Sequence, residues 1–376
     1  MCGFSCGLES KEEKMRVGIV TFWHNRGQGT VGRYLRGIFD SLGHQTFILA
    51  RPTPDQFERP AHIDRSDIWI QPDVTEGSTY DMAREEYVSW SEDNDIEAAF
   101  FFQNYQFDVI AELRAMGVKT IGTFMWERFA QKDVEDAKRA YDVIYSFNNC
   151  ELPRYKSLGM ETVKVSWGCH SELLKVKAEK KKDGIYFFYP AGYFDRRKPY
   201  MAVIEAFSKA ARPHIRLIVK SQTDKNISEV LGDLSELDPR ITVINGDAPT
   251  EEYFNLFASC HACVAPSRWE GMGLHLYESI ALGMPLITND NPPMNEHVRD
   301  HVNGLLVQSH MMVPDHPNRT LSGIPAYEPD VAALSSAIEQ MANPELLAEL
   351  ANNTIELQSE YSWDRTIEQF SELLYF

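Results

Sequence analysis

Short apolar runs alternate with amphipathic helical patterns along the first half of the chain. The run RVGIVTF at 16–22 is followed by a glycine-containing segment, a helical pattern over Tyr34–Leu42 and a second apolar run at 45–50. This order predicts a strand–helix–strand unit with parallel strands. Further strand-like runs alternate with helical stretches, which predicts a parallel sheet covered on both faces; they lie at 98–102, 120–125 and 143–147.

The same alternation resumes after a charged segment at 175–184, which we interpret as a solvated linker or turn. A segment rich in Met, His and Pro at 308–327 is expected to be a surface insertion before the next helix. We therefore expect an α/β protein with two Rossmann-like, doubly wound domains at 15–172 and 173–358, after a disordered stretch at 1–14. The strands of the second domain are expected at 185–190, 215–220, 241–244, 262–266 and 285–288.

Composition narrows the class of protein. A chain of 376 residues that is 43% hydrophobic and 24% charged suits two ordinary globular domains. Its net charge of −18 disfavours nucleic acid as a partner. Because no apolar run approaches the roughly 20 residues of a membrane span and the start lacks a signal-peptide pattern, we expect a cytoplasmic protein without an integral membrane segment. The sequence does not determine whether the protein forms a homo-oligomer.

The six cysteines are expected to be reduced in that compartment. Cys260 and Cys263 form a CxxC pair, but neither a second pair nor a histidine at zinc-site spacing accompanies them. The pair leads into an apolar run, so we interpret it as part of a buried strand and not as a metal or redox site.

Two open α/β sheets that face each other would place one ligand site in the crevice between them. Gly27, Gly29 and Gly32 form a GxGxxG pattern between a strand and a helix, where backbone amides, including that of Thr30, can receive an anion. An NAD site would require an acidic residue at the end of the next strand. That strand ends at Ala50-Arg51-Pro52, so only NADP would remain, and it would leave the second domain unexplained.

The most informative segment is APSRWEGMGLHLYESIALGMP at 265–285. Glu270 follows a predicted strand, Gly271 and Gly273 leave open backbone amides, and a predicted helix over 274–282 carries Glu278 on the side of the loop. A carboxylate in that position can accept hydrogen bonds from both hydroxyls of a ribose, each worth roughly 1.5–3 kcal/mol.

This segment resembles the Glu-x7-Glu motif of retaining glycosyltransferases of family 4, which have the GT-B fold. The resemblance covers most of the chain, because several weak motifs occur in the order of that family. These are the glycine segment with its Gly-His turn, FDRRKP at 194–199, the strand end IVK at 218–220, the 265–285 segment, NGLLV at 303–307 and SWD at 362–364. The resemblance implies two facing domains and a C-terminal helix at 359–376 that returns to the first domain.

The resemblance also implies a nucleotide-diphosphate sugar as donor, with no further cofactor, and a carbohydrate or other hydroxyl compound as acceptor. Glu278 would hold the ribose, Glu270 would face the transferred sugar and act with Lys198 in catalysis, and the leaving diphosphate would need cationic side chains. The implied donor site comprises Arg196, Arg197, Lys198, Lys220, Glu270, Gly271, Met272, Gly273, Leu274 and Glu278.

A metal ion is the competing means of neutralising a diphosphate. Asp93, Asn94 and Asp95 form a DxD sequence, but it precedes a predicted strand, whereas metal-using transferases place this motif after one. We therefore expect no required metal. Retention would then proceed either through a covalent sugar–Glu270 intermediate or, as the family favours, through attack from the same face.

The chain departs from the family pattern at two places. Gly192 and Tyr193 stand where many members have Gly-Arg, and Arg196 or Arg197 is the expected substitute. Met125-Trp126-Glu127 replaces a cleft histidine, as in a subset with a Trp-Glu pair. In that interpretation Trp126 stacks on a sugar and Glu127 accepts its hydroxyls, while the alternative is a partly buried aromatic beside a surface carboxylate. His24 is the other candidate cleft histidine.

The expected first-domain contribution to the cleft is therefore Gly27, Gly29, Thr30, Trp126 and Glu127. Two rival functions remain at this point. One is another enzyme on the same fold, a nucleotide-sugar epimerase or a phosphorylase. The other is a non-catalytic nucleotide-sugar-binding protein.

Overall fold

The computed structural model describes residues 14–53, 63–316 and 323–376. Within these residues the first half of the chain forms a sheet of seven parallel strands in the order β3-β2-β1-β4-β5-β6-β7. The strands are β1 (Arg16–Phe22), β2 (Gln45–Arg51), β3 (Val74–Glu76), β4 (Ala98–Phe102), β5 (Lys119–Thr123), β6 (Val143–Ser146) and β7 (Val163–Lys164).

Apolar side chains cover both faces of this sheet. Phe101 of β4 points into one cluster and Phe100 into the other, as expected for successive residues of a strand with two buried faces. The helices described in this half of the chain are α1 (Gly27–Ser41), η1 (Asp67–Trp69), α2 (Arg84–Asp93), α3 (Phe107–Ala115), η2 (Gln131–Asp133), α4 (Val134–Ala140) and α5 (Glu151–Ser157).

The second half repeats the arrangement with a parallel sheet of six described strands in the order β10-β9-β8-β11-β12-β13. Its strands are β8 (Ile185–Gly192), β9 (Ile215–Ser221), β10 (Ile241–Asn245), β11 (Ala262–Val264), β12 (Leu286–Asn289) and β13 (Gly304–Val307). Its helices are α6 (Ser171–Leu174), α7 (Tyr200–Lys209), α8 (Ile227–Leu231), η3 (Leu234–Glu236), α9 (Thr250–Ser259), α10 (Leu274–Ala281), α11 (Met294–His297), α12 (Val331–Met341) and α13 (Pro344–Leu357).

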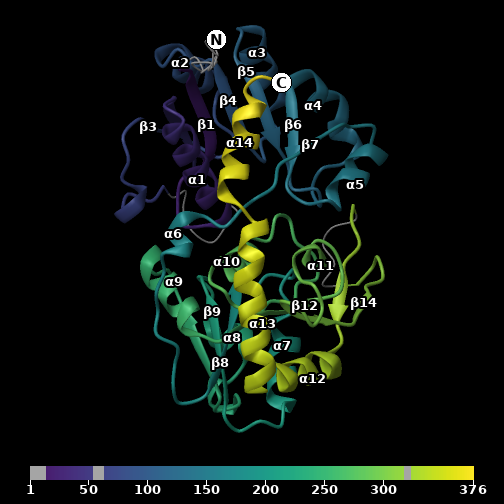
Figure 1. The fold of residues 1–376 in the computed structure, drawn as a ribbon. Coiled ribbons are helices and arrows are strands. Elements are labelled where there is room, and N and C mark those ends of the chain that lie inside the picture. The colour runs from purple at the N-terminus through teal and green to yellow at the C-terminus, as the bar shows by residue number, and fades with distance from the viewer. Residues whose placement is uncertain (1–13, 54–62, 317–322) are drawn as a thin grey trace, which may run out of the picture.

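The chain crosses between the domains twice, at neighbouring points. The first crossing follows β7, and there Cys169 N donates to the carbonyl oxygen of Tyr361 at 2.8 Å. The second leads from η4 (Gln358–Glu360) into α14 (Trp363–Leu373), which packs against α1 of the first domain (Figure 1). Phe370 of α14 is fully buried beside Phe100 and Tyr145, so the C-terminal helix is part of the first-domain core.

Two parallel, doubly wound sheets confirm the predicted fold class, but several elements differ from expectation. α1 begins at Gly27 and not at Tyr34, because the glycines permit close helix–strand contact: a Cβ at Gly29 would overlap the carbonyl oxygen of His24, and one at Gly32 would overlap Thr21. The GxGxxG pattern is therefore the start of the helix and not a loop before it. The expected disorder at 1–14 falls outside the described residues except for Lys14.

The segment 308–327 is not simply a surface insertion. β14 (Ser309–Met311) and β15 (Tyr327–Pro329) form an antiparallel pair. Between these strands, Met312 and Ile324 are buried in the same apolar cluster as Trp126, because their side chains pack against the first domain. Residues 317–322 of this segment lie outside the described residues.

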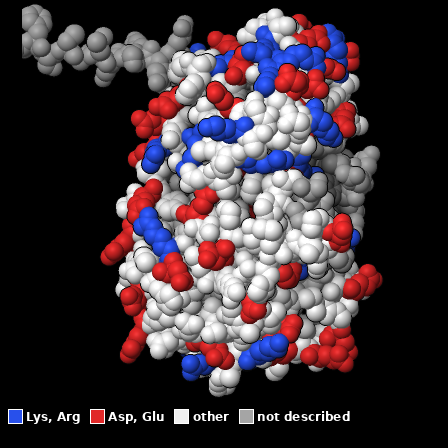
Figure 2. Space-filling view, turned by 90° about the vertical axis from the view of Figure 1, so that its right-hand side faces the viewer, with Lys and Arg blue, Asp and Glu red and all other residues white. Residues whose placement is uncertain are grey.

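Charge is unevenly distributed on the face shown in Figure 2. Lys and Arg side chains gather over the first domain, at the top, while Asp and Glu are spread over both domains. Among the described helices, none combines the length and apolar composition that crossing a membrane requires.

Candidate active site

A cavity of about 270 Å³ lies between the two domains, where the carboxyl ends of β1, β4, β5, β6 and β8 face one another. Both domains contribute charged residues to its lining. Of the residues predicted from sequence, the cavity brings together Gly27, Thr30, Arg197, Lys198, Glu270, Gly271, Met272, Gly273, Leu274 and Glu278.

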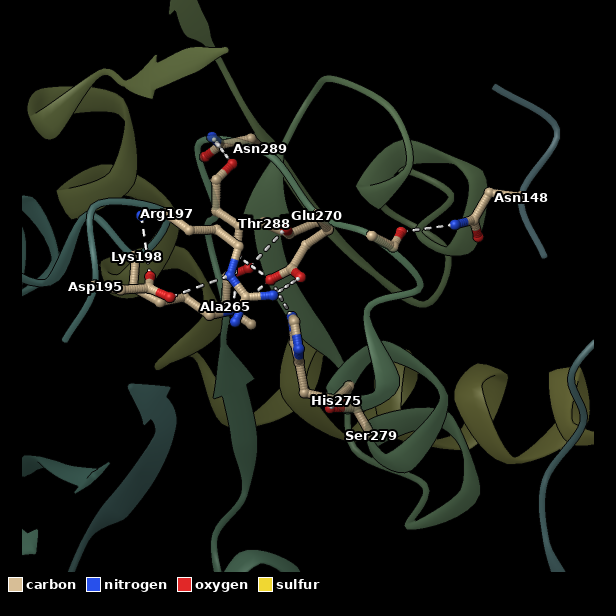
Figure 3. Close-up of polar contacts among 12 residues, drawn as sticks. Asn148, Asp195, Arg197, Lys198, Ala265, Glu270, His275, Ser279, Thr288 and Asn289 are labelled. Atoms are coloured by element: carbon tan, nitrogen blue, oxygen red, sulfur yellow. Dashed lines mark hydrogen bonds and ion pairs between the residues drawn. The ribbon is translucent and has the colours of Figure 1, made fainter. Parts of the chain in front are cut away.

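Glu270 lies at the centre of the polar contacts in Figure 3 and is 1% exposed. One carboxylate oxygen, Oε1, accepts from the ammonium of Lys198 and from Ser267 Oγ, the latter at 2.8 Å. The other, Oε2, accepts from Arg197 Nη1 at 2.8 Å. Burial opposes ionisation of Glu270, but the charges of Arg197 and Lys198 outweigh it and hold the pKa well below its usual range. Glu270 is therefore a carboxylate held between two cations.

The two cations respond differently to burial. Burial lowers the pKa of Lys198, and the neighbouring Glu270 opposes that shift only in part. Burial also disfavours the charged form of Arg197, but Glu270 and Asp195 raise its pKa overall. Lys198 Nζ donates to Ser267 Oγ at 2.9 Å as well, so its ammonium is fixed from two directions.

The loop that carries these cations is held in place by Arg268. The guanidinium of Arg268 donates to the carbonyl oxygen of Arg196 at 2.8 Å, and its backbone N–H donates to the carbonyl oxygen of Arg197 at 2.8 Å. Arg268 in turn forms an ion pair with Glu328. The side chain of Arg196 is exposed and does not line the cavity. Of the two adjacent arginines, which the sequence could not distinguish, only Arg197 therefore lines the cavity.

The helix α10 presents Glu278 and His275 to the cavity. Gly273 begins the helix with φ 75°, a left-handed conformation that favours glycine. Burial raises the pKa of Glu278 to about 7, against the opposing charge of Lys198. Burial, together with Lys198, lowers the pKa of His275 to about 3, so its imidazole is neutral, with Nε2 3.8 Å from Glu270 Oε1.

The structure contradicts the expected role of Trp126. The indole is 6% exposed, and its Nε1 donates to the carbonyl oxygen of Glu270 at 2.7 Å. Its faces are packed in the apolar cluster that also contains Phe129, so it holds the two domains together and has no free face for a sugar. Glu127 is buried and does not line the cavity either; burial raises its pKa, and Oε2 has no hydrogen-bond partner among the described residues.

Four further candidates lie away from the cavity lining. Gly29 packs on His24, which is itself buried beside Phe22. The Lys220 ammonium donates to the backbone carbonyl oxygens of Ser221, at 3.1 Å, and of Gly246. Gly246 belongs to the loop after β10, the strand next to β9, which carries Lys220. Among the described residues, the cavity lining includes none of Gly29, His24, Lys220 and Arg196.

The arrangement of the described residues does not support a metal site or a redox-active thiol site. The DxD residues lie at the end of α2 and before β4, at the sheet edge opposite the cavity. The described residues contain no group of three or more His, Cys, Asp or Glu side chains placed to hold a metal ion. Cys263 lies in β11 and Cys260 just before it, and both are buried free thiols.

Sequence reasoning missed several polar residues of the lining. Arg26 and Arg33 reach the cavity from α1, Glu151 begins α5, and Gln222 follows β9. Arg26, Glu151 and Gln222 lie beyond a strand's carboxyl end or at a helix start, which was the available signal, whereas Arg33 lies within α1. Asn148 was also missed; its Nδ2 donates to the carbonyl oxygen of Gly271 at 2.8 Å and links the first domain to the 265–285 segment (Figure 3).

Comparison with known proteins bears on this geometry. Residues 171–315 match the family model described as glycosyl transferases group 1. This segment contains Arg197, Lys198, Glu270 and Glu278, so the cationic loop and both glutamates lie within the part of the chain that matches this model. The chain is also 27% identical over 120 residues to a D-inositol 3-phosphate glycosyltransferase of Acidothermus cellulolyticus, a match that covers 32% of this chain and 22% of the relative.

Solved structures resemble the whole chain. Sucrose-phosphate synthase from Thermosynechococcus elongatus superposes with a TM-score of 0.72 at 18% identity, over 96% of this chain and 98% of that one. HepE from Anabaena, solved in complex with UDP and glucose, gives a TM-score of 0.71 at 13% identity, over 96% and 99% of the two chains. At such identities the likeness concerns the fold, and it confirms the GT-B arrangement of two facing Rossmann-like domains.

Proposed function

We propose that this protein is a retaining glycosyltransferase of the family 4 type, which moves a sugar from a nucleotide-diphosphate sugar to an acceptor hydroxyl without a required metal ion or further cofactor. The observation that carries the proposal is the triad of buried Glu270, buried Lys198 and half-buried Arg197. It faces an interdomain cavity and lies within the segment that matches group 1 glycosyltransferases.

The triad suits a diphosphate leaving group. In the structure the carboxylate of Glu270 forms ion pairs with both cations. A donor diphosphate would offer anionic oxygens to Lys198 and Arg197, and these cations would stabilise the charge that develops as the sugar–oxygen bond breaks. Arginine binds phosphate oxygens in a planar fork, whereas lysine acts as a point charge. Because these two side chains would neutralise the diphosphate as a metal ion otherwise does, they support metal independence.

The same contacts favour same-face attack over a covalent intermediate. A nucleophilic Glu270 would need an available carboxylate oxygen, but both oxygens accept hydrogen bonds from cations. Such contacts hold a carboxylate ionised and make it less nucleophilic. In the proposed step the acceptor oxygen bonds to the anomeric carbon, the bond from that carbon to the diphosphate breaks, and the acceptor proton passes to the leaving diphosphate. Glu278, at the first turns of α10, would accept hydrogen bonds from the donor ribose.

A thermal-shift screen against UDP, GDP, ADP and their sugars tests donor binding. A ligand at 100 times its Kd should add roughly 2.7 kcal/mol of stability. Donor hydrolysis or transfer in the presence of EDTA then tests catalysis without metal, and loss of activity that manganese restores would contradict metal independence. Binding of a donor without turnover across an acceptor panel would point to a nucleotide-sugar-binding protein.

Lys198→Ala tests the leaving-group contact. Because the ammonium would act mainly when diphosphate charge develops, kcat should fall about 10²–10³-fold, with a smaller rise in KM. Lys209→Ala removes an exposed lysine of α7 and provides the matched control. Equal kinetics in wild type and Lys198→Ala would remove Lys198 from the mechanism.

A further inference from the structure

The cavity has a shortage of positive charge on the side of the second domain. Tyr193 at the end of β8 is uncharged, and Arg196 is exposed away from the cavity. Lys198 and Arg197 share the carboxylate of Glu270, and Asp195 lies 3.8 Å from Arg197 Nε, so these residues together leave no more than one positive charge uncompensated. A diphosphate ester is a dianion, so a complementary site would need a further cation.

Two arginines of the first domain reach the same cavity, but only one of them is available. Both terminal nitrogens of Arg33 donate to the carboxylate of Glu172, Nη1 to Oε1 at 3.0 Å and Nη2 to Oε2 at 2.9 Å. Arg26 is held differently. Its Nε donates to Tyr193 Oη, its Nη1 lies 2.7 Å from Asp247 Oδ1, and Nη2 makes none of the hydrogen bonds found among the described residues.

Arg26 is also placed by its surroundings. It is the N-cap residue of α1, and its guanidinium carbon lies 5.0 Å from the centre of the Tyr193 ring. The preceding Asn25 donates from Nδ2 to the carbonyl oxygen of Ala248 at 3.1 Å. The first-domain segment before α1 therefore contacts the second-domain loop 246–248, which follows β10, and Tyr193, which follows β8.

The start of α1 adds to the positive potential at this point. The first turn contains no acidic residue and the N-cap side chain does not satisfy its amides, so the positive end of the helix dipole is uncompensated. Gly27 and Gln28 of this turn line the cavity with Arg26. An anion placed between the triad and the start of α1 would meet cations from both domains.

We propose that Arg26 is a donor-binding residue, which reaches across from the first domain to bind the diphosphate and uses Tyr193 as its support. The proposal rests on the function proposed above. Asp247, the present ion partner of Arg26, has a side chain that is 39% exposed, whereas that of Arg26 is 11% exposed. The partner is therefore the more solvated member, and a diphosphate within the cavity can replace it at the guanidinium. The bound donor would then contact both domains, through Arg26 of the first and the cationic loop of the second.

The experiment compares nucleoside diphosphate with nucleoside monophosphate, using the base that binds best, by calorimetric titration of the full chain. Arg26→Ala should weaken the diphosphate about 10- to 100-fold, as expected for loss of one or two charge-assisted hydrogen bonds, and should change monophosphate affinity much less. Arg26→Lys should recover part of the loss. Arg139→Ala, an exposed arginine of α4, is the matched control.

The outcomes separate this proposal from the general function. If Lys198→Ala weakens the diphosphate but Arg26→Ala binds it as wild type does, Arg26 is not a donor residue and the proposed function stands. If wild type binds no nucleoside diphosphate, both proposals fall. Tyr193→Phe supplies a variant that keeps the charge: it should weaken the diphosphate modestly, and an unchanged affinity would remove the supporting role of Tyr193. The melting temperature of each variant verifies folding.

Discussion

Glu270 determines the charge balance of the cavity. Its carboxylate is almost fully buried and compensates Lys198 and Arg197 at the same time. Without Glu270 the buried ammonium of Lys198 would have no anionic partner and Arg197 only Asp195, 3.8 Å from its Nε, so Glu270 has a structural role in addition to any role in the reaction. A donor diphosphate would share the two cations with Glu270 and would replace its charge in a variant that lacks the carboxylate.

Glu270→Gln tests this dual role. Loss of one charge should leave the buried Lys198 and the half-buried Arg197 repelling each other and lower the free energy of unfolding by about 3 kcal/mol. Urea unfolding with and without a bound nucleoside diphosphate measures the effect, and the ligand should stabilise the variant more than wild type because it supplies the missing anion. Glu372→Gln on the exposed side of α14 is the control. Equal ligand stabilisation of Glu270→Gln and wild type would contradict the exchange of Glu270 for diphosphate.

Glu151 gives the cavity a second property that can be tested by pH. Its side chain accepts hydrogen bonds from the backbone N–H groups of Phe147 and Asn148, but burial outweighs them and raises the pKa to about 8. Between pH 4.5 and 8 the native carboxyl therefore keeps a proton that the unfolded chain has released. Stability from this group is present below pH 4.5 and is lost as pH rises towards 8.

Glu151→Gln should remove that loss. The amide keeps an acceptor oxygen for the two backbone donors and does not ionise, so between pH 5 and 8 the variant should lose about 2–4 kcal/mol less unfolding free energy than wild type. Urea titrations at several pH values measure the difference, with the exposed Glu356→Gln as control. Parallel pH profiles for wild type and Glu151→Gln would show that Glu151 is ionised in the native protein.

The sequence predicted part of the residue-scale site. Glu270, Glu278 and Lys198 line one cavity, as their pattern indicated. It could not choose between Arg196 and Arg197, because the direction of each side chain depends on Arg268, about 70 residues further along the chain. It also placed Trp126 in contact with sugar, whereas the indole N–H instead finds a carbonyl oxygen 144 residues away.

Among the elements, α1 has the strictest requirement for small residues. Gly29 and Gly32 face β1 and the segment after it, so the helix can approach the sheet closely. Gly37 of the same helix is exposed, and a Cβ there would meet nothing within 4 Å. The glycines of one helix therefore differ in function although they look alike in the sequence.

Gly29→Ala and Gly37→Ala form a matched pair. The first would force the added methyl group against the His24 carbonyl oxygen and should cost about 2–4 kcal/mol. The second should stabilise the protein by about 0.5–1 kcal/mol, because alanine restricts the unfolded chain and favours the helix. Chemical unfolding of both variants measures the contrast. Similar stabilities would mean that α1 can move away from the sheet at no cost.

Elements with long apolar runs were predictable and short ones were not. All seven residues of β1 coincide with the predicted strand, since its side chains are buried on both faces. β3, β7, β14 and β15 contain only two or three residues each, too few for any periodicity to show. The start of α1 was misplaced because glycine, a poor helix former, is tolerated there for packing reasons.

At the scale of the molecule, the sequence predicted two facing sheets, but the contacts that fix their relation depend on pairs remote in the chain. The side chain of Trp126 donates to the carbonyl oxygen of Glu270, and that of Asn148 donates to the carbonyl oxygen of Gly271, so the first domain contacts the 265–285 segment directly. A third link is covalent. The chain returns through 361–363 and places α14 on the first domain, so a helix from the C-terminus completes the core of the N-terminal half (Figure 1).

Phe370→Ala tests whether α14 is integral to the first domain. Phe370 is fully buried and lies 5.4 Å from Tyr145, measured between ring centres, so its removal leaves a cavity in the core and should cost about 3–5 kcal/mol. Glu372→Ala, on the exposed side of the same helix, should change stability by less than about 0.5 kcal/mol. If α14 were only loosely docked, both variants would unfold at the same urea concentration. If it is integral, Phe370→Ala should lower the unfolding midpoint of the first domain, and bound nucleoside diphosphate should recover part of the loss because it holds that domain to the second.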